Sequence, residues 1–221
     1  MIKKVLIAED HESVNISVEK TLEELGMTQT DYVYYCDDAL ARIQKGVQDD
    51  QSYDLLITDL SFIKDSRVQK ISGGLELIPA VRQVQPDLRI IVFSVSCIPS
   101  TIEMLFGQSD IDGYVCKGRN DAKALKEAIE TVAKNQRYFP RHLTQKIRQK
   151  NVHDFTEYDI KIITLLANGM RQKDIPAYLI EEGTKPAGLS SIEKRLNYIK
   201  ETLEFTKNEQ LIAFCKDMGI I

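Results

Sequence analysis

Four short apolar runs in the first half of the chain each lead into a polar side chain that could take part in chemistry. The runs begin at residues 4, 55, 90 and 113, and their composition is typical of buried parallel strands. Groups at the carboxyl ends of such strands converge on one crevice, where open α/β sheets bind their ligands. The crevice is therefore expected to hold three carboxylates, a hydroxyl and an ammonium group, from Glu9, Asp10, Asp59, Ser94 and Lys117.

This set of groups suits a divalent cation and a phosphoryl group. Neighbouring carboxylates repel one another unless a cation neutralises them. Mg²⁺ prefers oxygen ligands and keeps several waters, so two carboxylates and a backbone carbonyl suffice to hold it. One carboxylate could attack a phosphoryl group to form an aspartyl phosphate, while Lys117 and Ser94 contact the phosphoryl oxygens. Each residue alone is more often an ordinary strand-end residue, but four endings in this order favour the site.

The elements that must position these groups alternate between strand-like and helical patterns. A further strand is expected at 32–36, and helices are expected at 13–25, 38–45, 75–84, 100–105 and 121–135. A strand followed by a helix, repeated five times, predicts an α/β domain with a doubly wound, five-stranded parallel sheet.

Strand patterns disappear in the last third of the chain. Helical spacing of apolar residues is found at 157–167, 172–180, 191–203 and 208–218. Thr156 and Asp159 form a capping pattern before the first of these helices, and Ser190 or Ser191 could cap the third. These patterns predict a small all-α domain.

The two domains are expected at 1–135 and 154–221, joined by a basic linker at 136–153. Residues 134–150 contain six basic residues and no acidic residue, whereas the chain as a whole has a net charge of -4. A nucleic-acid contact and a solvated linker both fit this charge.

The composition favours a cytoplasmic protein that does not contact a membrane. The first apolar run is short and ends in two acids, so it is neither a signal peptide nor a membrane span, and no later run approaches membrane length. The four cysteines lack the spacing of a zinc site. Cys97 and Cys116 are expected to be buried free thiols.

Residues 1–133 resemble the CheY-like receiver domain of bacterial two-component response regulators. The resemblance is carried by the acidic residues, the hydroxyl and the lysine described above, which fall on the positions of that family's motif. The resemblance implies a flavodoxin-like fold and phosphorylation of Asp59 by a sensor histidine kinase. It also implies a Mg²⁺ site, with Asp10, Asp59 and the backbone carbonyl of Ser61 as ligands and Glu9 acting through water.

The same resemblance implies a switch hydroxyl at Ser94, a phosphoryl-binding lysine at Lys117 and an aromatic switch residue at Tyr114. Without the family, Tyr114 is expected to be a partly buried strand aromatic. The chain departs from the family at residues 61–72, where the loop after Asp59 is longer and lacks the usual Met-Pro pair. This loop could cover the crevice with its cations or project into solvent.

The C-terminal helices resemble the four-helix DNA-binding domain of LuxR/NarL-type regulators, on the segments Thr156-Glu157, Lys173-Asp174-Ile175 and Ser191-Ile192. The resemblance implies a helix-turn-helix with its recognition helix at 191–204. Departures are extra residues within 181–189 and an acid at Glu193. The candidate DNA contacts are Lys173, Ser191, Lys194, Arg195 and Lys200.

The function expected from both resemblances is that of a transcriptional response regulator and not of an enzyme. Phosphorylation of Asp59 is expected to favour a homodimer and to switch binding to double-stranded DNA. The alternative is an output domain that binds a protein. An aspartyl-nucleophile hydrolase is disfavoured, because such enzymes usually have a second acid where this chain has Ser61.

Overall fold

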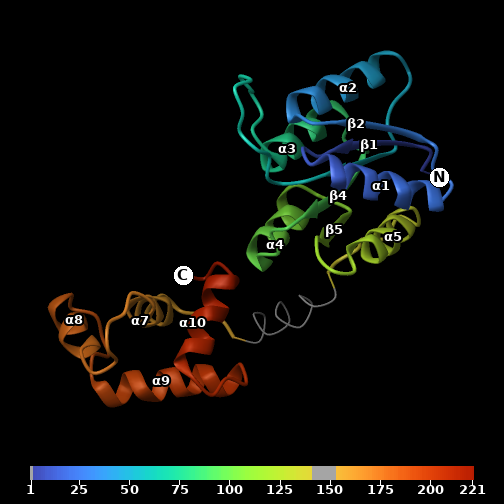
Figure 1. Ribbon diagram of the computed structural model, residues 1–221. Helices are drawn as coiled ribbons and strands as arrows, with labels where there is room; N and C mark the ends of the chain where they lie inside the picture. The colour runs from blue at the N-terminus through green and yellow to red at the C-terminus, as the bar shows by residue number, and fades with distance from the viewer. Residues whose placement is uncertain (1, 141–152) are drawn as a thin grey trace. The chain divides into compact units, whose positions relative to one another are not determined.

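The computed structural model describes residues 2–140 and 153–221 of the chain. It forms two compact units, and the main division between them falls after Pro140 (Figure 1). The linker expected at 136–153 lies for the most part outside the described residues, so the domain boundaries stay predictions. Among the helices described, none is both long and apolar enough to cross a bilayer.

The first unit is a five-stranded parallel sheet with the strand order β2-β1-β3-β4-β5, which confirms the predicted fold class. The strands are β1 (Lys4–Ala8), β2 (Gln29–Val33), β3 (Leu55–Thr58), β4 (Arg89–Ser94) and β5 (Gly113–Cys116). The helices are α1 (Glu12–Glu24), α2 (Cys36–Gln48), α3 (Gly74–Val84), α4 (Pro99–Gln108) and α5 (Asp121–Val132).

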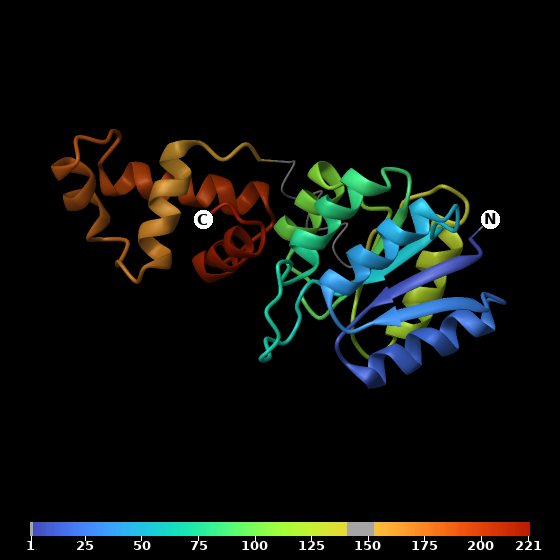
Figure 2. The same cartoon turned by 90° about the horizontal axis from the view of Figure 1, so that it is seen from above.

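Helices cover both faces of this sheet. α1 and α5 lie together on one face, where Val18 and Leu125 join a core with Val5 and Ile57 of the strands (Figure 2). α2 and α3 pack against each other on the opposite face. Because the central strands are buried on both sides, their sequences are continuous apolar runs, and this made them recognisable.

The edge strand β2 lies three residues earlier than the expected 32–36. Most of its residues are exposed or half-buried, so it has no apolar run to mark its start. Its position is set by backbone pairing with β1, which places Gln29 opposite Lys4 and Val33 opposite Ala8. The apolar pattern alone could not give this register.

The second unit is a helical domain with α7 (Glu157–Ala167), α8 (Ile175–Glu181), α9 (Leu189–Thr202) and α10 (Asn208–Asp217). All four helices contribute to one apolar core, with Ile163, Leu179, Ile199 and Phe214 among its buried members.

The predicted capping pattern before α7 is confirmed. The Asp159 amide donates to Thr156 Oγ1 over 3.2 Å, and the Thr156 amide donates to Asp159 Oδ2 over 3.0 Å. This reciprocal pair satisfies two amides at the helix start and fixes where α7 begins.

The start of α9 differs from the prediction. The helix begins at Leu189 with Gly188 as its N-cap, so Ser190 and Ser191 lie inside the first turn and neither caps it. The Ser191 amide donates instead to the Gly188 carbonyl over 3.0 Å. Extending the helix toward its N-terminus moves Lys194 from its first turn into its second.

Candidate functional site

The three expected carboxylates lie at the carboxyl ends of two neighbouring strands. Glu9 and Asp10 directly follow β1, and Asp59 directly follows β3. The strand order reverses between these strands, and such a position is where open α/β sheets bind ligands. Glu9 and Asp59 are nearly inaccessible, with 2% and 5% of their surfaces exposed. Two buried carboxylates at this position are costly in free energy unless a positive charge lies beside them.

Lys117 supplies that charge. Its ammonium nitrogen lies 2.6 Å from Glu9 Oε2 and 2.5 Å from Asp59 Oδ2, so it joins the ends of β1, β3 and β5. Burial favours a neutral amine, but the two carboxylates outweigh it and raise the pKa of Lys117. Burial also raises the pKa of Glu9, and the bond from Lys117 only partly offsets this.

The second carboxylate oxygen of Asp59 is fixed by the backbone. Its Oδ1 accepts from the Leu60 amide over 2.5 Å and from the Ser61 amide over 3.2 Å. One oxygen is thus held by amides and the other by Lys117. The side chain is therefore held in one orientation before any ligand arrives, which is the positioning that group transfer requires.

Asp10 lies at the edge of the same site with His11, a residue that the sequence patterns did not single out. Asp10 Oδ1 is 2.8 Å from His11 Nδ1, and Asp10 Oδ2 accepts from the Ile63 amide over 2.6 Å. The hydrogen bond to Asp10 raises the pKa of His11. Its position directly after two acids was the signal that could have identified it.

Glu9, Asp10 and His11 place one ligand atom each within 4.8 Å of one another. Glu9 and Asp10 offer hard carboxylate oxygens, and Asp59 is linked to Glu9 through Lys117. This oxygen-rich donor set fits Mg²⁺ better than a softer metal, because Mg²⁺ is bound by oxygens and retains several waters.

The two expected switch residues are both buried beside the loop between β4 and α4. Ser94 Oγ accepts from the Ser96 amide over 3.4 Å, and the Ser94 carbonyl accepts from the Lys117 amide over 2.8 Å. Tyr114 is fully buried, and its hydroxyl donates to the Ser96 carbonyl over 2.5 Å. Burial raises the pKa of Tyr114 to about 12, so the phenol stays a donor.

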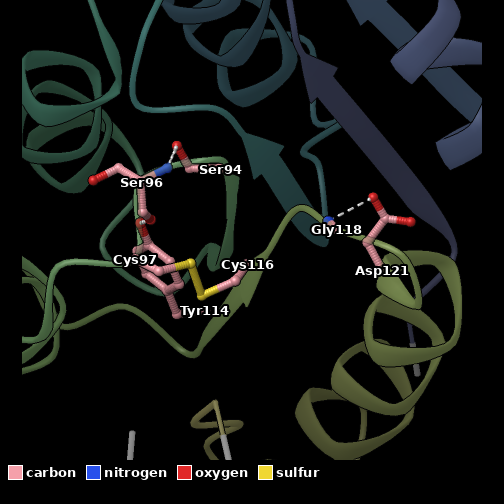
Figure 3. Close-up of a disulfide and its surroundings, with 7 residues drawn as sticks. All are labelled: Ser94, Ser96, Cys97, Tyr114, Cys116, Gly118 and Asp121. Atoms are coloured by element: carbon pink, nitrogen blue, oxygen red, sulfur yellow. Dashed lines mark hydrogen bonds between the residues drawn. A yellow bond between two sulfur atoms is a disulfide. The ribbon is translucent and has the colours of Figure 1, made fainter. Parts of the chain in front are cut away.

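The expectation of free thiols at Cys97 and Cys116 is wrong. The two form a disulfide with a Cα–Cα distance of 5.8 Å, which links the loop after β4 to the end of β5 (Figure 3). The residues are 19 apart in sequence, and their approach follows from the pairing of β4 with β5. Sequence spacing alone could not reveal it.

The long loop after Asp59 is held against α2. Arg67 donates to both carboxylate oxygens of Asp38 over 2.8 and 2.6 Å and lies over the Tyr35 ring at 4.2 Å. The loop is closed at its base by a bridge between Ser61 and Gly73, and it projects beside α3 in Figure 1. Arg67 is therefore engaged by α2, and the structure does not support its placement over the carboxylates.

Gly74, the first residue of α3, packs directly against the backbone of Asp59. A Cβ atom at Gly74 would overlap the Asp59 carbonyl oxygen, and one at Gly73 would lie 2.7 Å from the Leu60 carbonyl oxygen. Both neighbours are backbone atoms, which cannot rotate away as a side chain could. The absence of side chains at these two glycines therefore permits the observed position of Asp59.

Replacing Gly74 with alanine is expected to slow labelling by a small-molecule phosphodonor by about tenfold or more, because a displacement of about 1 Å can cost about 10²-fold in rate. The initial rate of incorporation of phosphate that alkali and hydroxylamine release measures this. Gly118→Ala is the matched control beside Lys117, since its Cβ would meet nothing within 4 Å. Equal rates for both variants would contradict the positioning role of Gly74.

The candidate residues of the helical unit do not share one environment. Lys173, Ser191 and Lys194 are exposed and Lys200 is half-buried. Arg195 instead makes a two-pronged ion pair with Asp159, with Nε 2.6 Å from Oδ1 and Nη2 2.7 Å from Oδ2. Asp159 has no exposed surface. Arg195 is about a third exposed and lines the same surface groove as Lys194, but its guanidinium is paired with a buried carboxylate, a contact that the sequence did not predict.

The extra residues before α9 bring another cation to this face. Lys185 lines a groove together with Ser191 and Lys194, and the groove is bounded by Tyr158 and Tyr198. The Tyr158 hydroxyl donates to the Pro186 carbonyl over 2.7 Å, which holds the inserted segment against α7. The insertion therefore places one more cation beside Lys194 on this face.

Comparisons with known proteins agree with this architecture. Residues 5–130 match the response regulator receiver domain. The chain is 26% identical to the nitrate/nitrite response regulator protein NarP of Escherichia coli K12, over 88% of each chain. It is 27% identical to the transcriptional regulatory protein RcsB of the same strain, over 77% of each chain.

The fold is also similar to solved structures. A structure of two RcsB dimers bound to two parallel DNAs has a TM-score of 0.63 and 20% identity, and the match covers 98% of this chain and 99% of that one. The receiver match spans more than half of the chain, and it includes the carboxylates, Ser94 and Lys117. The chain therefore belongs to the response regulator receiver family and is a two-component response regulator of the LuxR/NarL type.

Proposed function

We propose that Asp59 accepts a phosphoryl group from a phosphohistidine of a sensor histidine kinase. A carboxylate oxygen of Asp59 bonds to phosphorus as the bond from phosphorus to the kinase histidine breaks, giving an acyl phosphate and a free imidazole. The observation that carries the proposal is the contact of Lys117 with both Glu9 and Asp59. An ammonium group held there can stabilise the negative charge of the carboxylate before the transfer and that of the phosphoryl oxygens during and after it.

Mg²⁺ is proposed as the cofactor, with Asp10, Asp59 and the Ser61 carbonyl as ligands and Glu9 acting through water. The burial of Glu9 and Asp59, and the approach of ligand atoms from Glu9 and Asp10, support a cation at this edge of the sheet. When bound, the ion would neutralise the carboxylates and the phosphoryl oxygens. His11 Nδ1 lies 2.8 Å from Asp10 Oδ1 at the same edge.

The switch is proposed to act through Ser94 and Tyr114. A hydroxyl at Ser94 can donate to a phosphoryl oxygen on Asp59, and this would draw the loop after β4 toward the site. The Tyr114 hydroxyl is bonded to the Ser96 carbonyl in that loop, so the two residues are mechanically linked. A local change of charge is thereby coupled to the surface around α4 and β5, where a second copy of the chain is proposed to bind.

The proposed output is binding of double-stranded DNA by the helical unit as a homodimer. Support comes from the exposed Ser191 and Lys194 on α9, the added cation Lys185, and the likeness to regulators such as NarP and RcsB. Lys173 and Lys200 are proposed as further phosphate contacts. Arg195 is left out because Asp159 already engages its guanidinium.

A DNA-retention assay over a salt series, with and without a phosphodonor, tests the output. Phosphorylation is expected to raise affinity for genomic fragments located by footprinting, and the logarithm of affinity is expected to fall linearly with the logarithm of salt concentration. Lys194→Ala should weaken binding to all sequences and reduce the salt slope by about 1.

Lys216→Ala is the matched control, because it removes one exposed cation from α10 of the same unit. It is expected to leave retention and slope unchanged. If neither phosphorylation nor Lys194→Ala alters retention, the DNA proposal fails and the protein-binding alternative replaces it.

A further inference from the structure

The Cys97–Cys116 disulfide links the two segments of the proposed switch, the loop after β4 and the end of β5. Cys116 is the last residue of β5 and directly precedes Lys117, whose ammonium group contacts Asp59. Cys97 directly follows Ser96, whose carbonyl accepts from Tyr114 (Figure 3). The covalent bond thus joins the loop that follows the switch hydroxyl of Ser94 to the strand that carries the switch aromatic residue Tyr114.

This link restrains the loop in its present arrangement. The Tyr114 hydroxyl already ties β5 to Ser96, and the disulfide fixes the next residue of the loop to the end of the same strand. Displacing the loop relative to β5 requires the hydrogen bond between Tyr114 and Ser96 to break. A hydrogen bond of this kind breaks and forms again readily. With the disulfide intact, the loop remains attached even when that bond breaks.

We propose that Cys97 and Cys116 are a regulatory dithiol–disulfide pair, whose oxidation locks the loop between β4 and α4 and uncouples phosphorylation of Asp59 from the output. The inference rests on the proposed function and adds regulation to the same site. In the reduced protein the loop is free to follow Ser94 toward a phosphoryl group.

A small-molecule disulfide such as oxidised glutathione serves as the electron acceptor in the oxidation. One cysteine thiolate attacks a sulfur of that disulfide, releasing one glutathione thiolate and forming a mixed disulfide. The second cysteine thiolate then displaces the remaining glutathione. The two protein thiols lose two protons and two electrons in total, and the acceptor becomes two thiols.

The other two cysteines do not share this environment. Cys36 and Cys215 are free and fully buried, and burial raises the pKa of each thiol to about 12. Thiols of this kind stay protonated and react poorly with disulfides. Cys97 and Cys116 are both partly exposed, so a small thiol or disulfide can reach them. Redox chemistry is therefore expected at this pair, with the buried thiols as internal controls.

The first measurement is hydrogen exchange of residues 95–108 in the full chain, after treatment with oxidised glutathione or with dithiothreitol. Mass spectrometry of alkylated peptides establishes the redox state of the pair in each sample. Amides of this segment are expected to exchange about fivefold or more faster in the reduced protein. The double variant Cys97→Ser/Cys116→Ser, checked for folding by circular dichroism, should exchange at the fast rate in both buffers.

The second measurement is the output. Oxidised and reduced chains are labelled by a phosphodonor with Mg²⁺, and dimer formation is followed by light scattering. The oxidised chain is expected to take up label while its phosphorylation-dependent dimerisation falls about fivefold or more. The double variant should dimerise equally well in both buffers.

The two measurements separate the failures. Equal exchange of the oxidised and reduced chains, or no cross-linked Cys97–Cys116 peptide after oxidation, overturns the redox inference whatever the labelling shows. Labelling that is absent in both redox states, with exchange still redox-dependent, overturns the proposed function and leaves the locked loop intact. Equal dimerisation of labelled chains in both states overturns the uncoupling.

Discussion

Replacing Asp59 with asparagine is expected to reduce covalent labelling by a phosphodonor and Mg²⁺ to background, while the first unit stays folded. The amide has nearly the same shape, but it is not a nucleophile and does not carry the charge that draws the cation. Lys117 keeps Glu9 as a partner, so no buried ammonium group is left alone. Incorporation of phosphate that alkali and hydroxylamine release measures the loss, and circular dichroism reports on the fold.

Asp87→Asn is the matched control, because it makes the same chemical change at an exposed acid in the turn before β4. Its labelling should equal that of the unaltered chain. Undiminished labelling of the Asp59→Asn chain would place the nucleophile elsewhere and remove the basis of the proposed function.

Arg195→Ala is expected to destabilise the helical unit by about 1–3 kcal/mol, because the buried Asp159 carboxylate loses two charge-assisted hydrogen bonds and keeps only weaker partners. Asp159 has no exposed surface, and its carboxylate accepts hydrogen bonds from Nε and Nη2 of Arg195 and from the amide of Thr156, the N-cap residue of α7. The loss of stability is measured as faster hydrogen exchange of the buried amides of α7 and α9.

Arg171→Ala removes the same side chain from an exposed pair with Asp174 and serves as the control. It is expected to cost about 0–1 kcal/mol, as exposed ion pairs do. If Arg195→Ala behaves like the control in exchange and weakens only binding to a specific DNA site, the buried pair is not structural and Arg195 is a reader of bases.

The same pair sets a pH dependence. Burial opposes ionisation of Asp159, but the hydrogen bonds from Arg195 and Thr156 outweigh it, so its pKa is lowered. A carboxyl with a depressed folded-state pKa contributes stability above its unfolded value of about 3.9, and this is lost as pH falls through the folded value. Hydrogen exchange of the α7 amides, measured at a series of acidic pH values, should therefore become faster below about pH 4. This acceleration should be smaller in Arg195→Ala.

Much of the receiver site could be predicted from the sequence, because its residues follow strands that are buried on both faces. β1, β3, β4 and β5 are continuous apolar runs, so the residue after each run was identifiable without the fold. Parallel pairing then brings Glu9, Asp59 and Lys117 to one edge by geometry alone. The capping box of Thr156 and Asp159 was equally predictable, because it depends on residues three apart.

The features that escaped prediction depend on partners distant in the chain. β2 is an exposed edge strand placed only by pairing with β1, and the loop after Asp59 is positioned by Arg67 and Asp38, 29 residues apart. The sequence by itself determined which residues could do chemistry and at which end of the sheet they lie. The tertiary structure decided that Arg195 pairs with Asp159 and that Cys97 meets Cys116, because local periodicity specifies secondary structure but not which surfaces meet.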